Sequence, residues 1–499
     1  MTSIGTLSQP RARLAPSWPL AVGALVFAVT LALGPRDLAD PDIYFHIVTG
    51  RWIIAHGAVP HADLFSFTMR GAPWVAHEWL AEVIMALAYV GLGWHGLVIA
   101  AGLAVATAMA VLVRALLRSL DPAHALVAAG TAFLLLLPHL LARPHLFALP
   151  VMVAWIACLT AARDRERPPP LGAALLMVPW VNLHASFLFG LAFAAMLMGE
   201  AVLLATTREQ RLAALRGWAG FMAAAVLASF VTPNGFEAYL LPYRLLHMQY
   251  VLANLIEWQN TKLGAFQPLE VWLLLVLLAG FTLRLRLPPT RIAIVLLLAH
   301  MALAHWRYGE LLGFSAPLLI AAPAATQLGR FSGTTSSAFD HWMSDMARPG
   351  GFRGAAITAL IMVAVAGTFS TSALQPPDLF RPAAAIEAVR DHRVEGPVLN
   401  DYNFGGYLIF VGIPTFIDGR ADMYGDRFVK RESDAVDLHS GDLPALLDEF
   451  HIAWTLLPPD SRAVVLLDHL PGWHRLYADS IAVVHARSAS SNAEPQSKL

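Results

Sequence analysis

Long apolar runs recur along this chain, separated by short pieces rich in Arg or Pro. They are roughly 16 to 22 residues long, the length that a helix needs to cross the hydrocarbon core of a bilayer. Hydrophobic residues make up 57% of the sequence and charged residues only 14%, against about 25% charged in soluble globular proteins. The sequence therefore predicts an α-helical polytopic membrane protein. Its net charge of −1 gives no reason to expect a nucleic-acid partner.

Eleven membrane spans are predicted from these runs. They lie at residues 17–34, 96–117, 123–141, 145–162, 171–184, 186–206, 217–232, 269–286, 291–305, 311–327 and 354–372. The segment "EWLAEVIMALAYVGL", residues 78–92, is also apolar, but it is short and carries Glu78 and Glu82 in its first turns. We expect it to lie along the membrane surface as an interfacial helix, within a first outer loop at 35–95.

The distribution of basic residues supports this assignment, because cytoplasmic loops are enriched in Lys and Arg. With 78–92 at the surface, sixteen arginines fall on the cytoplasmic side and seven basic residues fall outside before residue 373. The sixteen are Arg11, Arg13, Arg114, Arg118, Arg163, Arg165, Arg167, Arg208, Arg211, Arg216, Arg284, Arg286, Arg291, Arg330, Arg348 and Arg353. The seven are Arg36, Arg51, Arg70, Arg143, Arg244, Lys262 and Arg307. This predicts a multi-pass protein of a bacterial inner membrane with a cytoplasmic N-terminus.

Residues 1–33 have the charge and apolar pattern of a signal peptide, but a retained first span is expected in a chain with so many others. Cys158, the single cysteine, lies inside an apolar run, where it serves packing.

The membrane part is assigned to 1–372 and a small extracytoplasmic α/β domain to 373–487. In that domain we predict strands at Tyr407–Val411 and Thr415–Asp418, and a short helix running into a strand over 443–459. Residues 488–499 are expected to be disordered.

Polar and acidic side chains gather on the predicted outer face, above all in "ADPDIYFHIVTGRWIIAHG". We expect a helix there with Asp40 as its N-cap, Pro41 in its first turn and Gly57 as its stop. Asp42 and His46 are four residues apart and share a face. Each acid also has a purely structural interpretation, in which Asp40 does no more than cap the helix and Asp42 does no more than complement the helix dipole.

Four further outer turns carry residues that could line one cavity with this loop. An arginine in "LLARPHLF" needs a partner at the membrane surface, and a guanidinium binds phosphate through two parallel hydrogen bonds. The alternative for each turn is an interface anchor or a side chain that reaches the lipid headgroups. The candidate substrate-binding residues are Arg143, His145, Asn182, His184, Arg307, His46, His77, Glu78 and Glu257.

A metal cofactor is not required by the pattern, because no pair of histidines has the spacing of a known zinc motif. Asp40, Asp42 and Glu257 could hold a hard divalent cation, Mg²⁺ or Mn²⁺, through oxygen ligands. No spacing fixes such a geometry, and no metal ligand is assigned.

The plan of the chain resembles the GT-C superfamily of membrane glycosyltransferases, nearest to the protein mannosyltransferase and aminoarabinose transferase branch. The resemblance lies in "DPDIYFHIVTGRWIIAHGAVPHADLFSFT", "HEWLAEVI", "ARPHLF", "WVNLHASFLFG" and "FIDGRADMYG". It implies a polyprenyl-phosphate-linked sugar donor and inverting transfer to an acceptor hydroxyl at the outer face. It also implies that an Asp or Glu in the first outer loop acts as the general base. Carried over to this chain, Asp40 and Asp42 match the base position, and Arg143 and Arg307 are candidates for the donor phosphate. This chain has "DPD" where the mannosyltransferase branch has "DE", so which acid is the base stays open.

Other functions compete with this one. A non-catalytic scaffold of envelope polysaccharide synthesis would keep the same fold, and a lipid-linked glycan ligase or polymerase would share its substrates. A transporter would place polar residues at mid-membrane, whereas here they collect at one face. The acceptor class, whether glycan, lipid or protein, is not fixed by the sequence. The turns in "NDYNFGGYLIF" and "FIDGRADMYGDR" serve chain reversal first, with acceptor binding as an alternative.

Overall fold

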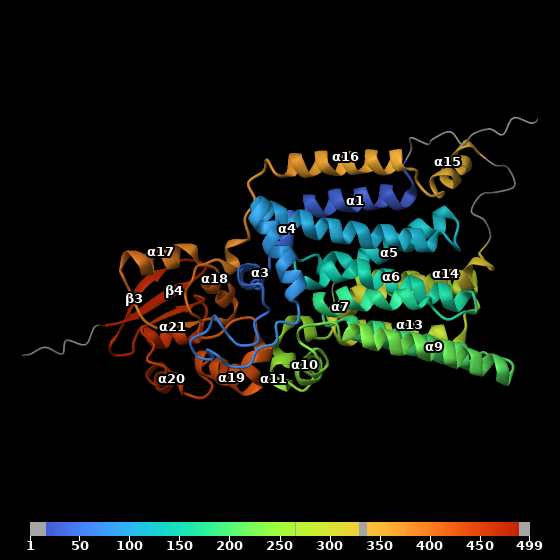
Figure 1. Ribbon diagram of the computed structural model, residues 1–499. Coiled ribbons are helices and arrows are strands. Elements are labelled where there is room, and N and C mark those ends of the chain that lie inside the picture. The colour runs from blue at the N-terminus through green and yellow to red at the C-terminus, as the bar shows by residue number, and fades with distance from the viewer. Residues whose placement is uncertain (1–15, 265, 329–336, 489–499) are drawn as a thin grey trace, which may run out of the picture.

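The computed structural model describes residues 16–264, 266–328 and 337–488. In these residues every one of the predicted spans contains helix. The apolar helices are α1 (Trp18–Ala32), α4 (Trp79–Leu116), α5 (Pro122–Leu136), α6 (Pro144–Asp164), η2 and α7 (Leu171–Leu176 and Met177–Leu183), α8 (Phe187–Leu203), α9 (Arg208–Ser229), α12 (Pro268–Leu283), α13 (Pro289–Ala304), α14 (Gly309–Ala325) and α16 (Phe352–Phe369). They form one bundle with roughly parallel axes (Figure 1).

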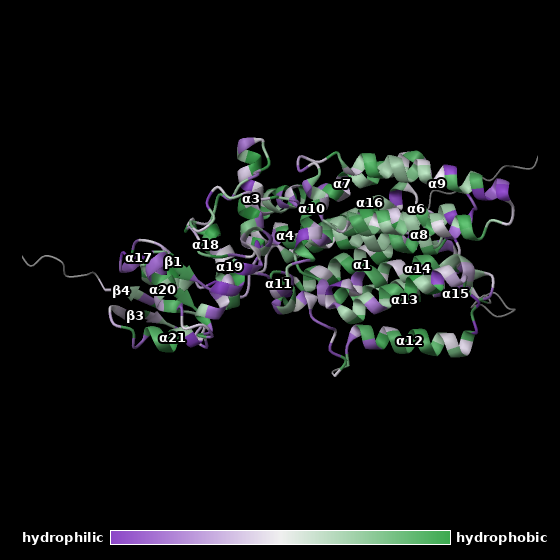
Figure 2. Cartoon of the chain, turned by 90° about the horizontal axis from the view of Figure 1, so that it is seen from below, coloured by the Kyte–Doolittle hydropathy of each residue, from purple (hydrophilic) through white to green (hydrophobic). Residues whose placement is uncertain are grey.

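The bundle has the surface of a membrane protein. Six of its helices are long and apolar enough to cross a membrane, and five more are apolar but shorter. Figure 2 shows that hydrophobic residues dominate the whole bundle, on its outside as well as within. On α12, for example, Leu277 is 54% exposed and Phe281 is 80% exposed, which suits a lipid environment and not water. The chain is a multi-pass membrane protein.

Helix α4 contains both the predicted interfacial segment and the second predicted span. The backbone leaves the helical region at Leu92 and Gly93, and Gly93 has a φ of +60°. Glycine tolerates that left-handed conformation without steric cost. Before this kink, α4 runs across the ends of the bundle helices (Figure 1). That direction is the one expected of a helix lying along a membrane surface.

The segment that connects α1 to α4, residues 33–78, is called the first loop below. It contains two helices. These are α2 (Gly34–Asp37) and α3 (Ile43–His56). The prediction for the start of α3 was wrong by two residues, because Asp42 and not Asp40 occupies the N-cap position. The Asp40 carboxylate instead accepts a hydrogen bond from the Asp42 amide, 2.7 Å away, which folds residues 40–42 into a turn before the helix. The end was predicted correctly, since Gly57 follows α3 with a φ of +60°.

The C-terminal region lies at one end of the bundle and is built on a four-stranded sheet (Figure 1). The strands are β1 (Val398–Asn400), β2 (Trp454–Leu457), β3 (Trp473–Ala478) and β4 (Val483–Arg487). Their order is β1-β2-β4-β3, with β1 parallel to β2 and the other pairs antiparallel.

Helices cover both faces of this sheet. The helices are α17 (Ala383–Asp391), α18 (Gly405–Phe410), α19 (Ala421–Val436), α20 (Leu443–Glu449) and α21 (Arg462–Leu467). Apolar residues of α17 and α18 form one core with Val398 and Val484. Those of α19, α20 and α21 form a second core with Leu399 and Val483. Neighbouring strand residues thus face opposite cores, the alternation that a pleated strand imposes.

Two strand predictions in this region were wrong. Tyr407–Val411 is mostly the helix α18, and Thr415–Asp418 lies outside the sheet, with only an isolated bridge from Thr415 to Ser66. A short apolar run cannot be assigned to strand or helix by its pattern alone. The prediction over 443–459 was correct, because α20 is followed by β2. Most of the predicted disordered tail, from residue 489 on, lies outside the described residues.

The remaining short helices connect these parts. They are α10 (Glu237–Leu245), α11 (Gln249–Asn254), η3 (Ile256–Trp258), η4 (Trp306–Tyr308), α15 (Ala338–Met346), η1 (Leu137–His139), η5 (Asp378–Phe380) and η6 (Tyr402–Phe404). α10 and α11 lie at the end of the bundle that carries the C-terminal region, whereas α15 lies at the opposite end (Figure 1).

Candidate functional site

Arg143 is the centre of a charged cluster at the end of the bundle next to the C-terminal region. Its Nε contacts Asp40 Oδ2 and its Nη1 contacts Glu257 Oε1, both at ion-pair distance. Its Nη2 lies 3.5 Å from Asp42 Oδ2. Three acids from two distant segments thus share one guanidinium, which presents its donors in a fixed planar fork.

The local sequence explains how Arg143 reaches this position. It precedes Pro144, which begins α6 with a ring already set for the first turn of a helix. The residue before a proline avoids the helical region, and Arg143 is extended, with φ −110° and ψ 160°. The Ala142 amide also donates a 2.7 Å hydrogen bond to the Asp37 carbonyl, which ties this turn to the first loop.

The two acids of the "DPD" motif have different environments. The Asp40 side chain is 1% exposed, accepts the Asp42 amide and is paired with Arg143. The Asp42 side chain is 22% exposed and makes only the longer contact to Arg143. Burial, followed by the charges of Asp418 and Glu78, raises the pKa of Asp42 to about 7. Asp42 is therefore the more accessible acid, with a raised pKa, whereas Asp40 holds the arginine.

Arg307 extends the cationic side of the cluster. Its Nη1 is 4.0 Å from Glu257 Oε2, and its guanidinium lies over the Trp258 ring at 4.8 Å from the centroid. Glu257 therefore stands between Arg143 and Arg307. Side-chain exposures of 29% for Arg307 and 31% for Glu257 leave both groups accessible to a ligand. Both arginines were predicted from the sequence to bind the donor phosphate. In the structure both contact the same carboxylate, that of Glu257.

A loop of the C-terminal region closes over Asp42. A Cβ atom placed on Gly419 would lie 1.9 Å from Asp42 Oδ1, so only glycine permits this approach. The hydroxyl of Tyr402 donates a 3.0 Å hydrogen bond to the Gly419 carbonyl and fixes the backbone there. The "FIDGRADMYG" segment was singled out in the sequence, but its contact with Asp42 could not be predicted.

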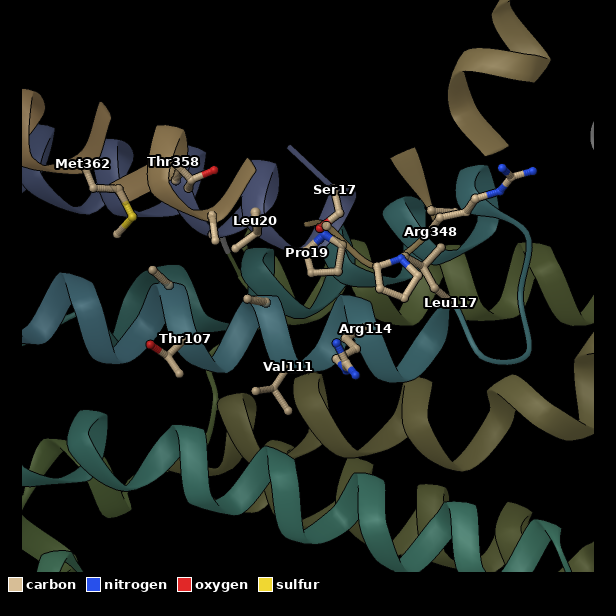
Figure 3. Close-up of a pocket in the computed structure, with 18 of the residues that line it drawn as sticks. Ser17, Pro19, Leu20, Thr107, Val111, Arg114, Leu117, Arg348, Thr358 and Met362 are labelled. Carbon is tan, nitrogen blue, oxygen red and sulfur yellow. The ribbon is translucent and has the colours of Figure 1, made fainter. Parts of the chain in front are cut away.

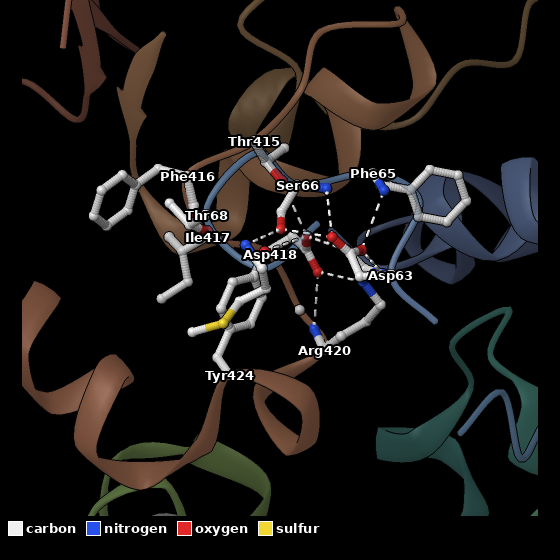
Figure 4. Close-up of polar contacts among 12 residues, drawn as sticks. Asp63, Phe65, Ser66, Thr68, Thr415, Phe416, Ile417, Asp418, Arg420 and Tyr424 are labelled. Atoms are coloured by element: carbon white, nitrogen blue, oxygen red, sulfur yellow. Dashed lines mark hydrogen bonds and ion pairs between the residues drawn. The ribbon is translucent and has the colours of Figure 1, made fainter. Parts of the chain in front are cut away.

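A buried arginine fastens the same loop to the first loop (Figure 4). Arg420 donates to both Asp418 oxygens, at 2.7 Å each, and to Asp63 Oδ1 at 2.6 Å. Its guanidinium also packs on the rings of Phe65 and Trp74. Burial raises the pKa of Asp418, but the charge of Arg420 and the hydrogen bonds from Arg420 and Tyr424 together outweigh this effect and hold that pKa below its ordinary value.

Backbone pairing strengthens this junction. The Phe67 amide donates to the Thr415 carbonyl at 3.1 Å, and the Thr415 amide donates to the Phe65 carbonyl at 3.2 Å. The Thr68 hydroxyl donates to the Phe416 carbonyl at 2.6 Å. The segment predicted as the strand Thr415–Asp418 thus pairs with the first loop and not with the sheet. Its position next to Asp42 follows from this pairing.

The helix α18 packs on the start of α3. A Cβ on Gly406 would lie 2.2 Å from the Pro41 carbonyl oxygen, so the glycine allows the helix to approach the "DPD" turn. The rings of Tyr407 and Phe410 lie edge-on to Tyr44, at centroid distances of 5.4 Å each. Gly406 in "NFGGYLIF" therefore allows α18 to pack closely on the "DPD" turn, and this contact helps to fix the distance between the C-terminal region and the site.

A second group of predicted residues forms a row of neighbouring histidines and acids. His77 Nε2 and His184 Nε2 lie 3.7 Å and 3.6 Å from Glu78 Oε1. His145 Nε2 lies 3.6 Å from Glu310 Oε2, and the His145 and His184 rings are 6.3 Å apart. Burial raises the pKa of Glu78. The charge of Glu78 raises the pKa of Asp42, so this row of histidines and acids contributes to the electrostatic environment of the site.

Two other predicted residues are engaged in packing contacts. The Asn182 amide donates to the Val178 and Val231 carbonyls and accepts from Trp79 Nε1, which joins α7, the turn after α9, and α4. His46 Nδ1 is 3.1 Å from Glu82 Oε1, and both side chains are buried. These contacts give Asn182 and His46 a positional role.

The predicted oxygen ligands do not fit a divalent cation as they are arranged. Asp40, Asp42 and Glu257 surround the Arg143 guanidinium, which already supplies the positive charge. Among the residues that the structure describes, no three His, Cys, Asp or Glu side chains are grouped as metal ligands. We therefore derive no chemical step through a metal ion.

Comparison with known proteins gives a match by structure only. No protein-family model matches the sequence, and no curated protein matches it. The oligosaccharyltransferase of Archaeoglobus fulgidus in its apo form superposes with a TM-score of 0.50 and 9% identity, covering 88% of this chain and 69% of that chain.

Two structures of ArnT from Cupriavidus metallidurans also align along 96% of this chain and 98% of theirs. The apo form has 16% identity and a TM-score of 0.44, and the form bound to undecaprenyl phosphate has 15% identity and a TM-score of 0.42. These two scores are below the level at which a common fold follows. The match to the oligosaccharyltransferase shows that the two proteins share a fold, and this fold is the one that the sequence resemblance implied.

Proposed function

We propose that this protein transfers a sugar from a polyprenyl-phosphate-linked donor to an acceptor hydroxyl at the outer face of the membrane. The observation that carries the proposal is the pairing of Asp42 with Arg143. An accessible carboxylate, whose pKa burial raises to about 7, stands 3.5 Å from a guanidinium suited to a phosphate. Both lie at the end of a polytopic bundle, where a lipid-linked donor can present its headgroup while its tail stays in the bilayer.

Asp42 is the residue we assign as the base. In an inverting single displacement, the acceptor oxygen forms a bond to the anomeric carbon while the bond from that carbon to the phosphate oxygen breaks. The acceptor hydroxyl proton passes to the Asp42 carboxylate. Asp40 is less suited to this role, because its side chain is 1% exposed and its oxygens already accept from Arg143 and the Asp42 amide.

Arg143 and Arg307 are assigned to the leaving phosphate. The Glu257 carboxylate lies between them, so an anionic group is already accommodated at this position. A donor phosphate that displaced Glu257 would gain both guanidinium groups as partners. Their positive charge would stabilise the lipid phosphate as it leaves, when its own charge increases.

The test uses the full chain in lipid vesicles together with lipid-linked sugars extracted from the source organism. We expect one polyprenyl phosphate to be released for each sugar transferred, as followed by mass spectrometry of both products. Polyprenyl phosphate release without a glycosylated acceptor would indicate hydrolysis. No release with any donor, from protein shown to be folded, would favour the scaffold function.

A further inference from the structure

A cavity lies at the end of the bundle opposite the C-terminal region, away from the Arg143 cluster. It has a volume of about 590 Å³ and is formed by α1, the second half of α4, α16 and residues 347–350 (Figure 3). None of its lining residues belongs to the Arg143 cluster. The arginine distribution along the sequence predicts that this end faces the cytoplasm.

Three arginines line the cavity. Arg114 and Arg118 stand one turn apart on the last turns of α4 and just beyond, and Arg348 follows α15. No Asp or Glu is among the described residues that line it. Arg348 lies 3.6 Å from Asp345, but both side chains are more than half exposed, and such a surface pair is readily exchanged for another anion. The charge of the cavity therefore calls for an anionic ligand.

The walls of the cavity are apolar and open a groove along two helices. Gly23 and Ala24 on α1 face Ala106 and Ala110 on α4, and a Cβ on Gly23 would come within 3.3 Å of the Ala106 carbonyl oxygen. These small side chains let α1 and α4 pack closely, and they form the apolar floor of the groove, which α16 also lines. The groove suits a hydrocarbon chain and would hold no ligand that is polar throughout.

Two tryptophans lie close in sequence to residues that line the cavity. Trp18 Nε1 donates a 3.0 Å hydrogen bond to the Met343 carbonyl, and the Trp18 and Trp342 rings pack edge to face at 5.1 Å. Tryptophans of this kind settle at the headgroup level of a bilayer. Ser17, which is 5% exposed and lines the cavity, makes no side-chain capping hydrogen bond at the start of α1. Its hydroxyl adds a hydrogen-bond donor to the cavity lining.

We propose that this cavity binds an anionic phospholipid of the adjacent leaflet. The phosphate would lie among Arg114, Arg118 and Arg348, and one acyl chain would follow the groove where α1, α4 and α16 meet. The charge complementarity and the headgroup depth together select a lipid of the surrounding bilayer. This binding site is separate from the proposed transferase site and does not depend on that activity.

The test measures lipid binding to the full chain by native mass spectrometry, with phosphatidylglycerol and phosphatidylcholine as probes. An arginine next to an anionic headgroup strengthens binding roughly fivefold, so we expect a preference for phosphatidylglycerol of roughly tenfold or more. The double variant Arg114→Gln/Arg118→Gln should remove most of this preference. Ala24→Leu, which fills the groove, should weaken binding of both lipids.

The control is Arg208→Gln/Arg211→Gln, which removes two exposed arginines from α9 at the same end of the bundle. It should leave the preference unchanged, and melting curves would show that every variant is folded. Equal binding of the two lipids, or an equal loss in the control variant, would overturn the proposal. Displacement of phosphatidylglycerol by an equal concentration of inorganic phosphate would also overturn it, because the groove would then contribute nothing.

Discussion

Gly419 and Asp42 meet where the C-terminal region contacts the first loop, and a Cβ on Gly419 would lie 1.9 Å from Asp42 Oδ1. The proposed base is thus held from two sides. Arg143 approaches it from the bundle, and the Gly419 backbone approaches it from the C-terminal region. The C-terminal region is therefore part of the proposed active site, although it supplies no group to the reaction.

Replacing Gly419 tests whether this contact positions the base. We expect Gly419→Ala to displace the Asp42 carboxylate and to lower kcat about 100-fold, because a shift of 1 Å has an effect of that size. Binding of undecaprenyl phosphate should change little. Gly220→Ala is the matched control, since a Cβ on Gly220 meets no atom within 4 Å. Wild-type kcat in Gly419→Ala would show that the contact is not needed for transfer.

The pH dependence of transfer follows from the raised pKa of Asp42. A base must be ionised to accept a proton, and burial, Asp418 and Glu78 raise this pKa to about 7. The rate should therefore fall as the pH is lowered through 7, by about tenfold for each further pH unit. Rates measured from pH 5 to pH 9 in folded protein would show this limb. A flat profile between pH 5 and pH 7 would contradict the assignment.

The ion pairs of Arg420 should be essential for the junction between the first loop and the C-terminal region. Asp63→Asn removes one carboxylate from a guanidinium that is 2% exposed but keeps its pair with Asp418, so we expect a destabilisation of about 1.5–3 kcal/mol, the effect of one hydrogen bond between charged groups. We expect a lower melting temperature and faster proteolysis of the first loop. Arg431→Gln, which breaks an exposed pair with Glu449, is the control and should leave both unchanged. Equal stability of the two variants would show that the buried pair contributes little.

Binding of the lipid phosphate can be tested apart from catalysis. Glu257 occupies the space between Arg143 and Arg307, so Glu257→Gln should bind undecaprenyl phosphate more tightly than wild type. Arg307→Gln should bind it about tenfold more weakly, the effect of one charge-assisted hydrogen bond. Arg244→Gln removes an exposed arginine that is paired with Glu237 and serves as the control. Unchanged affinity in both Glu257→Gln and Arg307→Gln would exclude this position for the phosphate.

Much of the membrane part could be predicted from the sequence because span length and apolar composition are set by the bilayer. Every predicted span contains helix, and the kink at Leu92 and Gly93 separates the surface segment from the following span. In the C-terminal region the same reasoning was less reliable. "GGYLIF" has a strand-like composition, but Gly406 lets it pack as a helix on Pro41, a tertiary contact that no local pattern reveals.

The components of the site were predicted, but their arrangement was not. Asp40, Asp42 and Glu257 were grouped as oxygen ligands, and the structure places the Arg143 guanidinium among them. The contact of Asp63 with Arg420 joins residues 357 positions apart, so no spacing rule could have shown it. Asn182 and His46 have the residue types of a binding site, yet their hydrogen bonds serve helix packing and a buried pair.

The most direct test of the account is the rate of sugar transfer by Asp42→Asn, measured beside Asp40→Asn in the same vesicles. Asn has the size of Asp and cannot accept the proton, so folded Asp42→Asn should lose about 10²- to 10⁴-fold in rate while still binding undecaprenyl phosphate. Asp40→Asn should mainly weaken that binding, because Arg143 loses its buried partner. Transfer at the wild-type rate by folded Asp42→Asn would contradict the account.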